Sequence, residues 1–330
     1  MRAASGIARR IGGFAALLIL AVAALGPAPV RAAPAVCTIG VSIESLHDLD
    51  MAADSFGADL WLWTVCPSSL PRGPLETIDF PTAGSLARDA AEVTVLGDGR
   101  TYASQRITGT FRFNWIMDDY PFDRQTVVIP IEESEYGADE LVFEPDTAES
   151  FLATRARETL SQWRVSELVL TTRVSAEESA YGFPGAANPS YAAADATFVL
   201  ERTSLVPFLK LTSGVLAAAF IAVFSFFYNP QEPGTFPGRL GLLVGVLFAT
   251  LVNMRTADSS LGDIDDLTLV TRIHLVTLGF IALLAVLALL DRLRTDGGAT
   301  LPHPHWRRIT GMVVAYVLIV LGMILLSMLS

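Results

Sequence analysis

The pattern of hydrophobic and polar residues divides the chain into two halves. Over residues 33–203, short segments of alternating apolar and polar positions are separated by turn residues, a pattern typical of antiparallel strands. Over residues 204–330, four apolar stretches follow that are long enough to cross a bilayer as helices. We therefore expect a β + α membrane protein, with a β domain first and a four-helix transmembrane bundle after it.

The alternating segments predict seven or more strands and no long helix in the first half. They lie at residues 38–46, 58–65, 91–96, 106–117, 125–132, 163–174 and 195–202. Gly97, Asp98 and Gly99 follow the third segment and favour a hairpin turn. This number of short strands predicts an immunoglobulin-like β-sandwich, in which one side of each strand faces the core.

The apolar stretches predict transmembrane helices at about residues 205–228, 238–256, 267–290 and 308–329. Arg239 stands at the start of the second stretch and further arginines lie between the third and fourth, whereas residues 258–266 are acidic and contain no lysine or arginine. Because cytoplasmic connections carry an excess of positive charge, the β domain and the carboxyl terminus are expected outside the cytoplasm.

The first residues, 1–32, predict export of the segment that follows them. Arg2, Arg9 and Arg10 precede an apolar core, and small or aliphatic residues follow it, as in a cleaved secretory signal peptide. Cys37 and Cys66 are the two cysteines of the chain, and both lie in the exported half. An oxidising compartment would allow them to form a disulfide, and two free thiols are the alternative.

The charge of the chain favours some classes of binding partner and disfavours others. The formal net charge is -11, and acidic side chains outnumber basic ones more than two to one over residues 33–204. This balance disfavours nucleic acid and acidic ligands and attracts cations, although a solvated acidic surface is an ordinary explanation for most of these charges. Glu132, Glu133 and Glu135 stand beside Tyr136, and carboxylates next to an aromatic ring can hold an ammonium group.

No residue pattern predicts catalysis. The sequence shows no Ser/His/Asp or Cys/His constellation and no set of residues with metal-ligand spacing. We therefore expect neither an enzyme nor a bound cofactor or metal.

The second apolar stretch is unusual for a simple membrane anchor. Counting by three and four places the following residues on one helical face: Pro237, Gly241, Gly245, Phe248, Val252 and Arg255. This face changes from small to bulky and apolar and then to polar, so several copies around an axis could form a pore. The alternative is a packing helix, because Gly241 and Gly245 form a GxxxG step that lets helices approach closely.

Residues 117–125, MDDYPFDRQ, carry a family resemblance. With Tyr120, Pro121, Phe122 and Asp123 as its core, this segment resembles the pentameric ligand-gated ion channels, the Cys-loop receptor superfamily, and in particular the bacterial branch without the loop cysteines. The resemblance spans almost the whole mature chain and includes the four helices. It implies a homopentamer in a bacterial inner membrane, with the lipid bilayer, permeating ions and a small-molecule ligand as partners. The acidic charge described above favours a cationic ligand and disfavours nucleic acid.

The resemblance also assigns roles to single residues. Tyr120 to Asp123 would couple the two halves, with Asp123 paired to Arg202 just before the first helix. The ligand site would lie between subunits and use Glu132, Glu133, Tyr136, Tyr181, Phe183 and Tyr191, although Ser134 stands where the family usually has an aromatic residue.

Pore selectivity is also suggested by the resemblance. Pro237, Gly238 and Arg239 resemble the start of the pore helix in the family's anion channels, so Arg239 joins the expected pore residues and anions are favoured. A non-conducting membrane-anchored sensor or binding protein of the same architecture is the alternative function.

Overall fold

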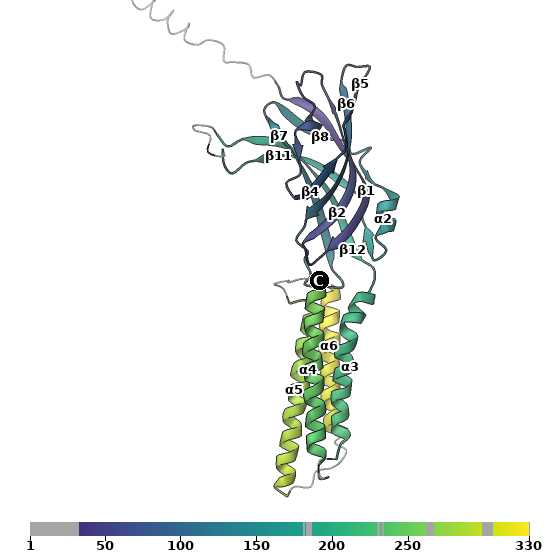
Figure 1. The fold of residues 1–330 in the computed structure, drawn as a ribbon, viewed down its shortest axis with the longest axis vertical. Helices are drawn as coiled ribbons and strands as arrows, with labels where there is room; N and C mark the ends of the chain where they lie inside the picture. Colours follow the sequence, from purple (N-terminus) through teal and green to yellow (C-terminus); the bar gives the residue numbers. More distant parts are fainter. Residues whose placement is uncertain are drawn as a thin grey trace, which may run out of the picture.

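The computed structural model describes residues 33–180, 182, 187–229, 232, 234–261, 267–298 and 306–329. A part rich in β strands stands on one end of a bundle of four long helices, and the carboxyl end of the chain lies at the junction between them (Figure 1). The expectation of β sheets followed by membrane-length helices is therefore confirmed. The expected signal peptide, residues 1–32, lies outside the described residues.

Within the described residues, the first sheet has seven strands. Five follow one another in the order β4 (Ala83–Arg88), β6 (Thr101–Arg112), β2 (Ser55–Cys66), β1 (Ala35–Asp50) and β8 (Leu141–Pro145). Two short strands flank them, β5 (Glu92–Val95) on β6 and β9 (Phe151–Leu152) on β1. β5 and β6 form the expected hairpin, in which Gly99 takes the left-handed conformation that its turn requires.

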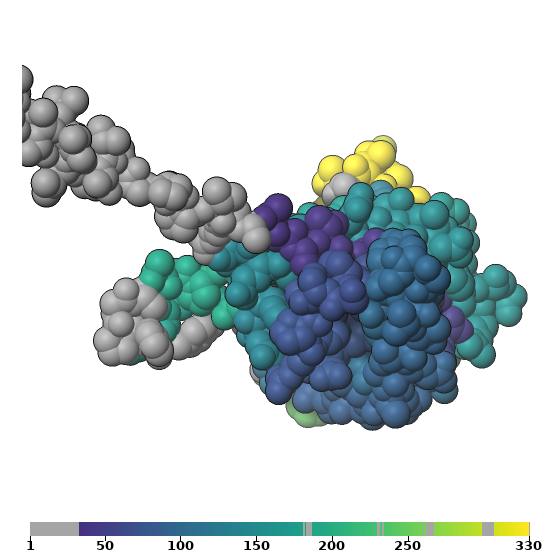
Figure 2. Space-filling model, turned by 90° about the horizontal axis from the view of Figure 1, so that it is seen from above, coloured from purple at the N-terminus to yellow at the C-terminus, as the bar shows by residue number. Residues whose placement is uncertain are grey.

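The second sheet has five strands in the described part of the chain. Four are ordered β10 (Trp163–Val165), β12 (Ser190–Arg202), β7 (Arg124–Gly137) and β3 (Ile78–Asp79), and β11 (Val169–Ala176) also pairs with β12. The hairpin of β11 and β12 projects sideways from the body of the molecule (Figures 1 and 2). Burial in β7 alternates residue by residue over most of its length, as the sequence pattern predicts.

Two predicted strands differ from those observed because side chains replace the ladder hydrogen bonds. Residues 163–174 form two strands, since the Ser166 hydroxyl accepts a hydrogen bond from the Val199 amide between them. β6 ends at Arg112 instead of continuing to residue 117, and the Gln125 side chain pairs with both backbone polar groups of Ile116. A short helix, α2 (Thr154–Thr159), lies before β10.

Buried aromatic side chains connect the two sheets. Phe56 of β2 stacks on Phe111 of β6 with ring centroids 5.6 Å apart. Phe56 also makes an edge-to-face contact with Phe198 of β12, with ring centroids 6.4 Å apart. All three are almost fully buried, and burying a side chain of this size stabilises a fold by roughly 1.5–3 kcal/mol. Cys37 of β1 and Cys66 of β2 form a disulfide, which confirms that prediction.

The helical part contains α3 (Val206–Phe224) with the short helix η2 (Ser225–Phe227) after it, α4 (Thr235–Leu261), α5 (Leu269–Asp296) and α6 (Trp306–Leu329). In the described part of the chain these four helices are long and apolar enough to cross a membrane, as the sequence predicts. α4 is longer at both ends than the predicted 238–256. At its start, the Thr235 hydroxyl donates to the carbonyl of Asn229.

A polar contact fixes α4 in the bundle. Nδ1 of His274 lies 2.8 Å from the Val270 carbonyl, so it must carry the proton, and Nε2 is left to accept a hydrogen bond from the Asn253 amide at 3.0 Å. The same Asn253 nitrogen donates to the Leu211 carbonyl at 3.2 Å, and Gly214 leaves room for this side chain. One asparagine thus joins α4 to both α3 and α5.

Candidate functional site

α4 has one buried and one exposed side. Its buried residues, among them Leu243, Val246, Thr250 and Ala257, recur every three or four positions and face the neighbouring helices of the same chain. On the opposite side, six of the seven predicted pore residues are exposed: Pro237, Gly241, Gly245, Phe248, Val252 and Arg255. The structure therefore brings these six together on a face that the chain itself leaves uncovered.

Arg239 is the exception, and its predicted place in a pore is corrected. Its side chain is only 3% exposed, with Nη2 3.5 Å from Oδ2 of Asp291 on α5. The guanidinium also lies over the ring of Phe226, 4.0 Å from its centroid. Nine residues separate Arg239 from Phe248, which is about 2.5 helical turns, so the two side chains leave α4 in opposite directions.

The GxxxG step of α4 is not used for packing within the chain. A Cβ atom added at Gly241 or Gly245 would have no neighbouring atom within 4 Å. Close packing at these glycines would therefore need a partner outside the described chain, such as a second copy.

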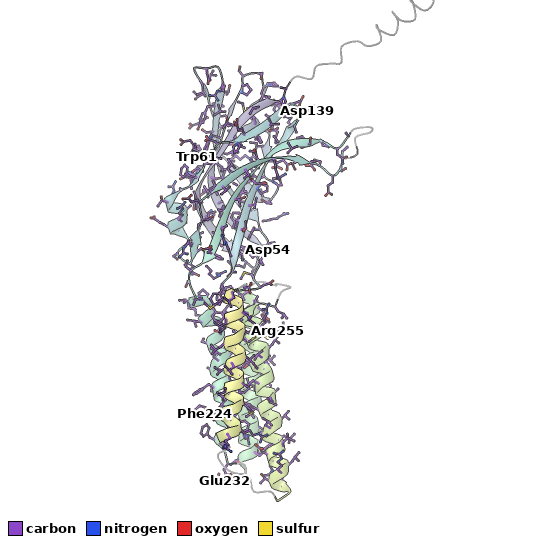
Figure 3. The ribbon with its side chains drawn as sticks, turned by 180° about the vertical axis from the view of Figure 1, so that it is seen from behind. Asp54, Trp61, Asp139, Phe224, Glu232 and Arg255 are labelled. Atoms are coloured by element: carbon purple, nitrogen blue, oxygen red, sulfur yellow. A yellow bond between two sulfur atoms is a disulfide. The ribbon has the colours of Figure 1, made fainter. Side chains whose placement is uncertain are left out.

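Arg255 places a charge on the exposed side of α4. It lies within the apolar span Thr235–Ser259 and close to the β-rich part, as Figure 3 shows. A guanidinium facing acyl chains costs several kcal/mol at depth, on the order of 2.5–3.5 on insertion scales. This side of α4 therefore suits water or a protein partner better than lipid.

At the junction of the two halves, Asp123 and Arg202 form the expected ion pair. The register of β7 with β12 pairs Arg124 with Glu201, which places Asp123 and Arg202 side by side. Nε of Arg202 donates to Oδ1 of Asp123 at 2.8 Å, and Nη2 donates to Oδ2 at 3.2 Å. The Asp123 side chain is 2% exposed and the Arg202 side chain 5%, so the pair is shielded from solvent.

Two aromatic rings enclose the Arg202 guanidinium. Its central carbon lies 4.0 Å from the ring centroid of Trp163 and 4.7 Å from that of Tyr120. Burial raises the pKa of the Tyr120 hydroxyl. Tyr120 therefore stacks inside the β-rich part, whereas Phe122 is half-buried. In the sequence, only its position at the start of a predicted strand marks Trp163.

The loop that carries Asp123 also contacts the helices. The Ser327 hydroxyl of α6 donates to the Asp119 carbonyl at 3.2 Å. The peptide bond between Tyr120 and Pro121 is cis, and Pro121 is buried. The turn between β1 and β2, which ends at Asp54, also reaches the helical part (Figure 3). Residues 262–266, which follow α4, lie outside the described residues.

Two of the predicted ligand residues serve the fold instead, which corrects their assignment. Glu133 is fully buried, where Oε2 accepts from the Thr77 hydroxyl and Oε1 accepts from the Glu135 and Tyr136 amides. The Tyr136 ring is buried, and its hydroxyl accepts from the Arg72 amide at 3.0 Å. Neither side chain is available to a ligand.

Glu132 and Tyr191 remain as candidates on the second sheet. Both are half-buried, and Oε1 of Glu132 is buried without a hydrogen-bond partner in the described residues. Ala193 pairs with Glu132 on one side and with Arg173 on the other, so these residues share one face. Tyr181 and Phe183 lie outside the described residues.

Arg173 and Asp195 are polar neighbours that the sequence analysis missed. Nε of Arg173 donates to Oδ2 of Asp195 at 2.9 Å. This hydrogen bond is the main cause that raises the pKa of Arg173, and the charge of Glu132 adds to it. A cation bound at Glu132 would therefore have to compete with Arg173. The signal that could have revealed this pair is the opposite charge at diagonal positions of one hairpin, where Arg173 pairs with Ala193 and Asp195 pairs with Thr171.

In comparisons with known proteins, no family model and no curated protein matches this chain.

Proposed function

We propose that this protein is a homopentameric ligand-gated ion channel in which α4 lines the pore. The observation that carries the proposal is the exposed side of α4, where a small, then apolar, then charged series of residues is left uncovered by the chain itself. Five copies around an axis would cover this side and enclose water, which also accommodates Arg255.

The junction supports a link between the two halves. The shielded pair of Asp123 and Arg202 lies where the last strand leads into α3, and the same loop contacts α6. A change at the sheets would therefore be transmitted to the helices through a charged contact that tolerates little displacement. In this proposal the two sheets pack as an immunoglobulin-like sandwich outside a bacterial inner membrane.

Ligand and ion preferences follow from charge. The ligand is a small cationic molecule that binds between subunits at the Glu132 carboxylate, near Tyr191. The permeating ions are anions, because the exposed residues of α4 from Pro237 to Arg255 include an arginine and no carboxylate. Arg239 is buried and does not contribute to this selectivity.

A thiol-labelling experiment tests the pore directly. The two native cysteines are joined in a disulfide, so a single introduced cysteine gives a clean signal. Val252 and Val286 are 52% and 54% exposed in the chain, on α4 and α5 respectively. We expect a charged, water-soluble methanethiosulfonate reagent to label Val252→Cys in membranes and to leave Val286→Cys, which would face lipid, unlabelled.

Subunit counting and conductance complete the test. Cryo-EM of the purified protein should show five subunits in a ring, and planar bilayers should show unitary currents. Equal protection of Val252→Cys and Val286→Cys in well-folded pentamers would contradict a water-filled pore and favour the non-conducting sensor.

A further inference from the structure

A cavity of about 360 Å³ lies between the β-rich part and the helices. Its wall contains the turn after β1, the loop before β10, the end of β12, the start of α3 and the end of α4. This volume is within the range of small-molecule sites, which is roughly 300–1,000 Å³. Nothing in the proposed ligand site or pore uses this cavity.

One side of the cavity is apolar. Leu49 comes from the end of β1, Met51 from the turn after it, Pro207 from the first turn of α3 and Leu261 from the last turn of α4. These residues come from both halves of the molecule, so an apolar group between them would contact both. The ends of α3 and α4 place the cavity at the boundary of the apolar spans, where amphiphilic molecules collect.

The other side presents hydrogen-bond donors that the protein does not use. Ser161 and Gln162 are exposed, and their side chains have no hydrogen-bond partner in the described residues. Arg202 also lines the cavity, and Asp123 occupies its Nε and Nη2 but not Nη1. A hydroxyl, an amide and a guanidinium thus meet at one wall, and such a set favours a ligand with an acceptor oxygen.

The charges of Arg202 and Asp123 determine which kind of ligand group the cavity favours. The Arg202 charge is already balanced by Asp123, which is within hydrogen-bond distance of it, and the surrounding half of the chain is acidic. A carboxylate would be repelled by Asp123, and an ammonium group would be repelled by the Arg202 guanidinium. We propose that the cavity binds a neutral amphiphile whose carbonyl oxygen accepts from Gln162, Ser161 and Arg202, with its hydrocarbon chain against Leu49, Met51 and Leu261.

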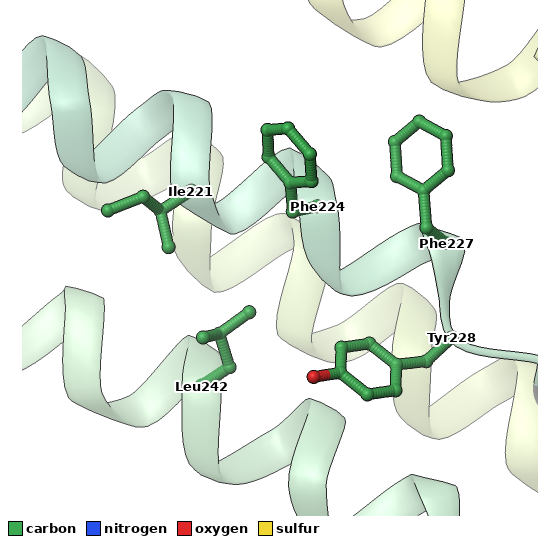
Figure 4. Close-up of a pocket in the computed structure, with 5 residues that line it drawn as sticks. All are labelled: Ile221, Phe224, Phe227, Tyr228 and Leu242. Carbon is green, nitrogen blue, oxygen red and sulfur yellow. The ribbon is translucent and has the colours of Figure 1, made fainter.

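A second cavity lacks the hydrogen-bond donors that distinguish the first. It also has about 360 Å³, lies at the opposite end of the bundle, and is lined by Ile221, Phe224, Phe227, Tyr228 and Leu242 (Figure 4). The Tyr228 hydroxyl is the single polar side-chain group among these residues. Without converging donors, it gives no reason to expect more than an acyl chain.

The test uses Trp163 in the cavity wall as a fluorescent reporter. Bromine quenches tryptophan on contact, so the full-length protein in lipid nanodiscs is titrated with 8-bromooctanamide. Matched probes are 8-bromooctanoate, 8-bromooctylamine and 1-bromooctane. We expect saturable quenching by the amide, weaker binding of the other three, and loss of most of the signal in Trp163→Phe. Trp61→Phe, in the first sheet, should leave the signal in place.

Gln162 variants distinguish the proposed contact from general partitioning. Gln162→Leu removes one neutral hydrogen bond and should weaken amide binding by about fivefold. Gln162→Glu replaces a donor by an acceptor at constant shape and should shift the preference toward the amine.

Three results would overturn the proposal. They are quenching that does not saturate, equal binding of 1-bromooctane and the amide, and tighter binding of the carboxylate. Because the readout is binding and not current, a failure here would leave the channel proposal intact, and the converse also holds.

Discussion

Arg239 and Asp291 meet inside the helical bundle at the end far from the sheets, with Nη2 3.5 Å from Oδ2. Asp291 is fully buried, and its Oδ1 accepts a hydrogen bond from Nη1 of Arg308 at 2.8 Å. One carboxylate of α5 therefore binds arginines of both α4 and α6. Asp291 is thus the residue that fixes the start of α4 against its neighbours.

Asp291→Ala should strongly destabilise the protein. It leaves the guanidinium of Arg239 buried and unpaired, and breaking a buried ion pair in this way costs roughly 3–5 kcal/mol. The double variant Arg239→Met, Asp291→Leu should recover most of this loss because it removes both charges. The measurement is the thermal unfolding midpoint in detergent.

Asp296→Ala is the control for this effect. Its i,i+4 pair with Arg292 is exposed, so the substitution should change the unfolding midpoint little. Similar shifts for Asp291→Ala and Asp296→Ala would contradict the role of Asp291.

The disulfide between Cys37 and Cys66 should be detectable in the purified protein. The intact mass should increase on reduction by two hydrogen atoms, and alkylation should require reductant. Replacing both cysteines by serine should lower stability by about 2–4 kcal/mol, because the bridge closes a long loop in the unfolded chain. Two alkylatable thiols in non-reduced protein would show that the bridge does not form.

Features that depend on residues close together in the sequence could be predicted, whereas contacts between residues far apart in the sequence could not. The alternation in β7 and the length of the apolar helices are local, and both were predicted. The partner of Glu133 is not local: Thr77 lies 56 residues away, and only the pairing of β3 with β7 brings them together. The isolated polar residues Asn253 and His274 lie in separate apolar helices, so their contact is equally invisible to local patterns.

Arg239 shows a different source of error. A three-residue motif placed it at the mouth of a pore, whereas helical periodicity already put it opposite Phe248. The structure follows the periodicity, because a buried carboxylate on α5 compensates the charge. Where a short motif and the helical period disagree, the period is the better guide to which side of a helix a residue occupies.

Asp123 and Arg202 should be more important for gating than for assembly. Asp123→Ala leaves Arg202 between two aromatic rings without its counter-charge, so movement at the junction is no longer transmitted. Exchanging the two charges in one double variant should restore part of the function. Currents and the fraction of pentamers are measured together. The control is Asp98→Ala, which removes a far more exposed Arg–Asp pair in the hairpin of β5 and β6, away from the proposed ligand site. Full activity of Asp123→Ala would exclude a coupling role for the pair.

Phe248 should close the proposed pore at rest. It lies at the middle of the exposed side of α4, so five symmetric copies would place a ring of phenyl groups across the axis, with Val252 one turn further on. Narrow apolar constrictions exclude water and ions without complete steric closure. Phe248→Ser makes this ring polar and wider, so it should hydrate the constriction and produce leak current without any stimulus, measured in planar bilayers.

Phe220→Ser is the matched control for this effect. Phe220 lies on α3 and is 66% exposed in the chain, compared with 67% for Phe248, so the two substitutions remove the same side chain from equally uncovered positions. If α4 lines the pore and α3 faces lipid or a neighbouring subunit, only Phe248→Ser conducts at rest, and Phe220→Ser can do no more than lower expression. If well-folded pentamers of both variants are silent, Phe248 is not a gate, and α4 is a packing helix whose glycines and phenylalanine contact another protein surface instead of water.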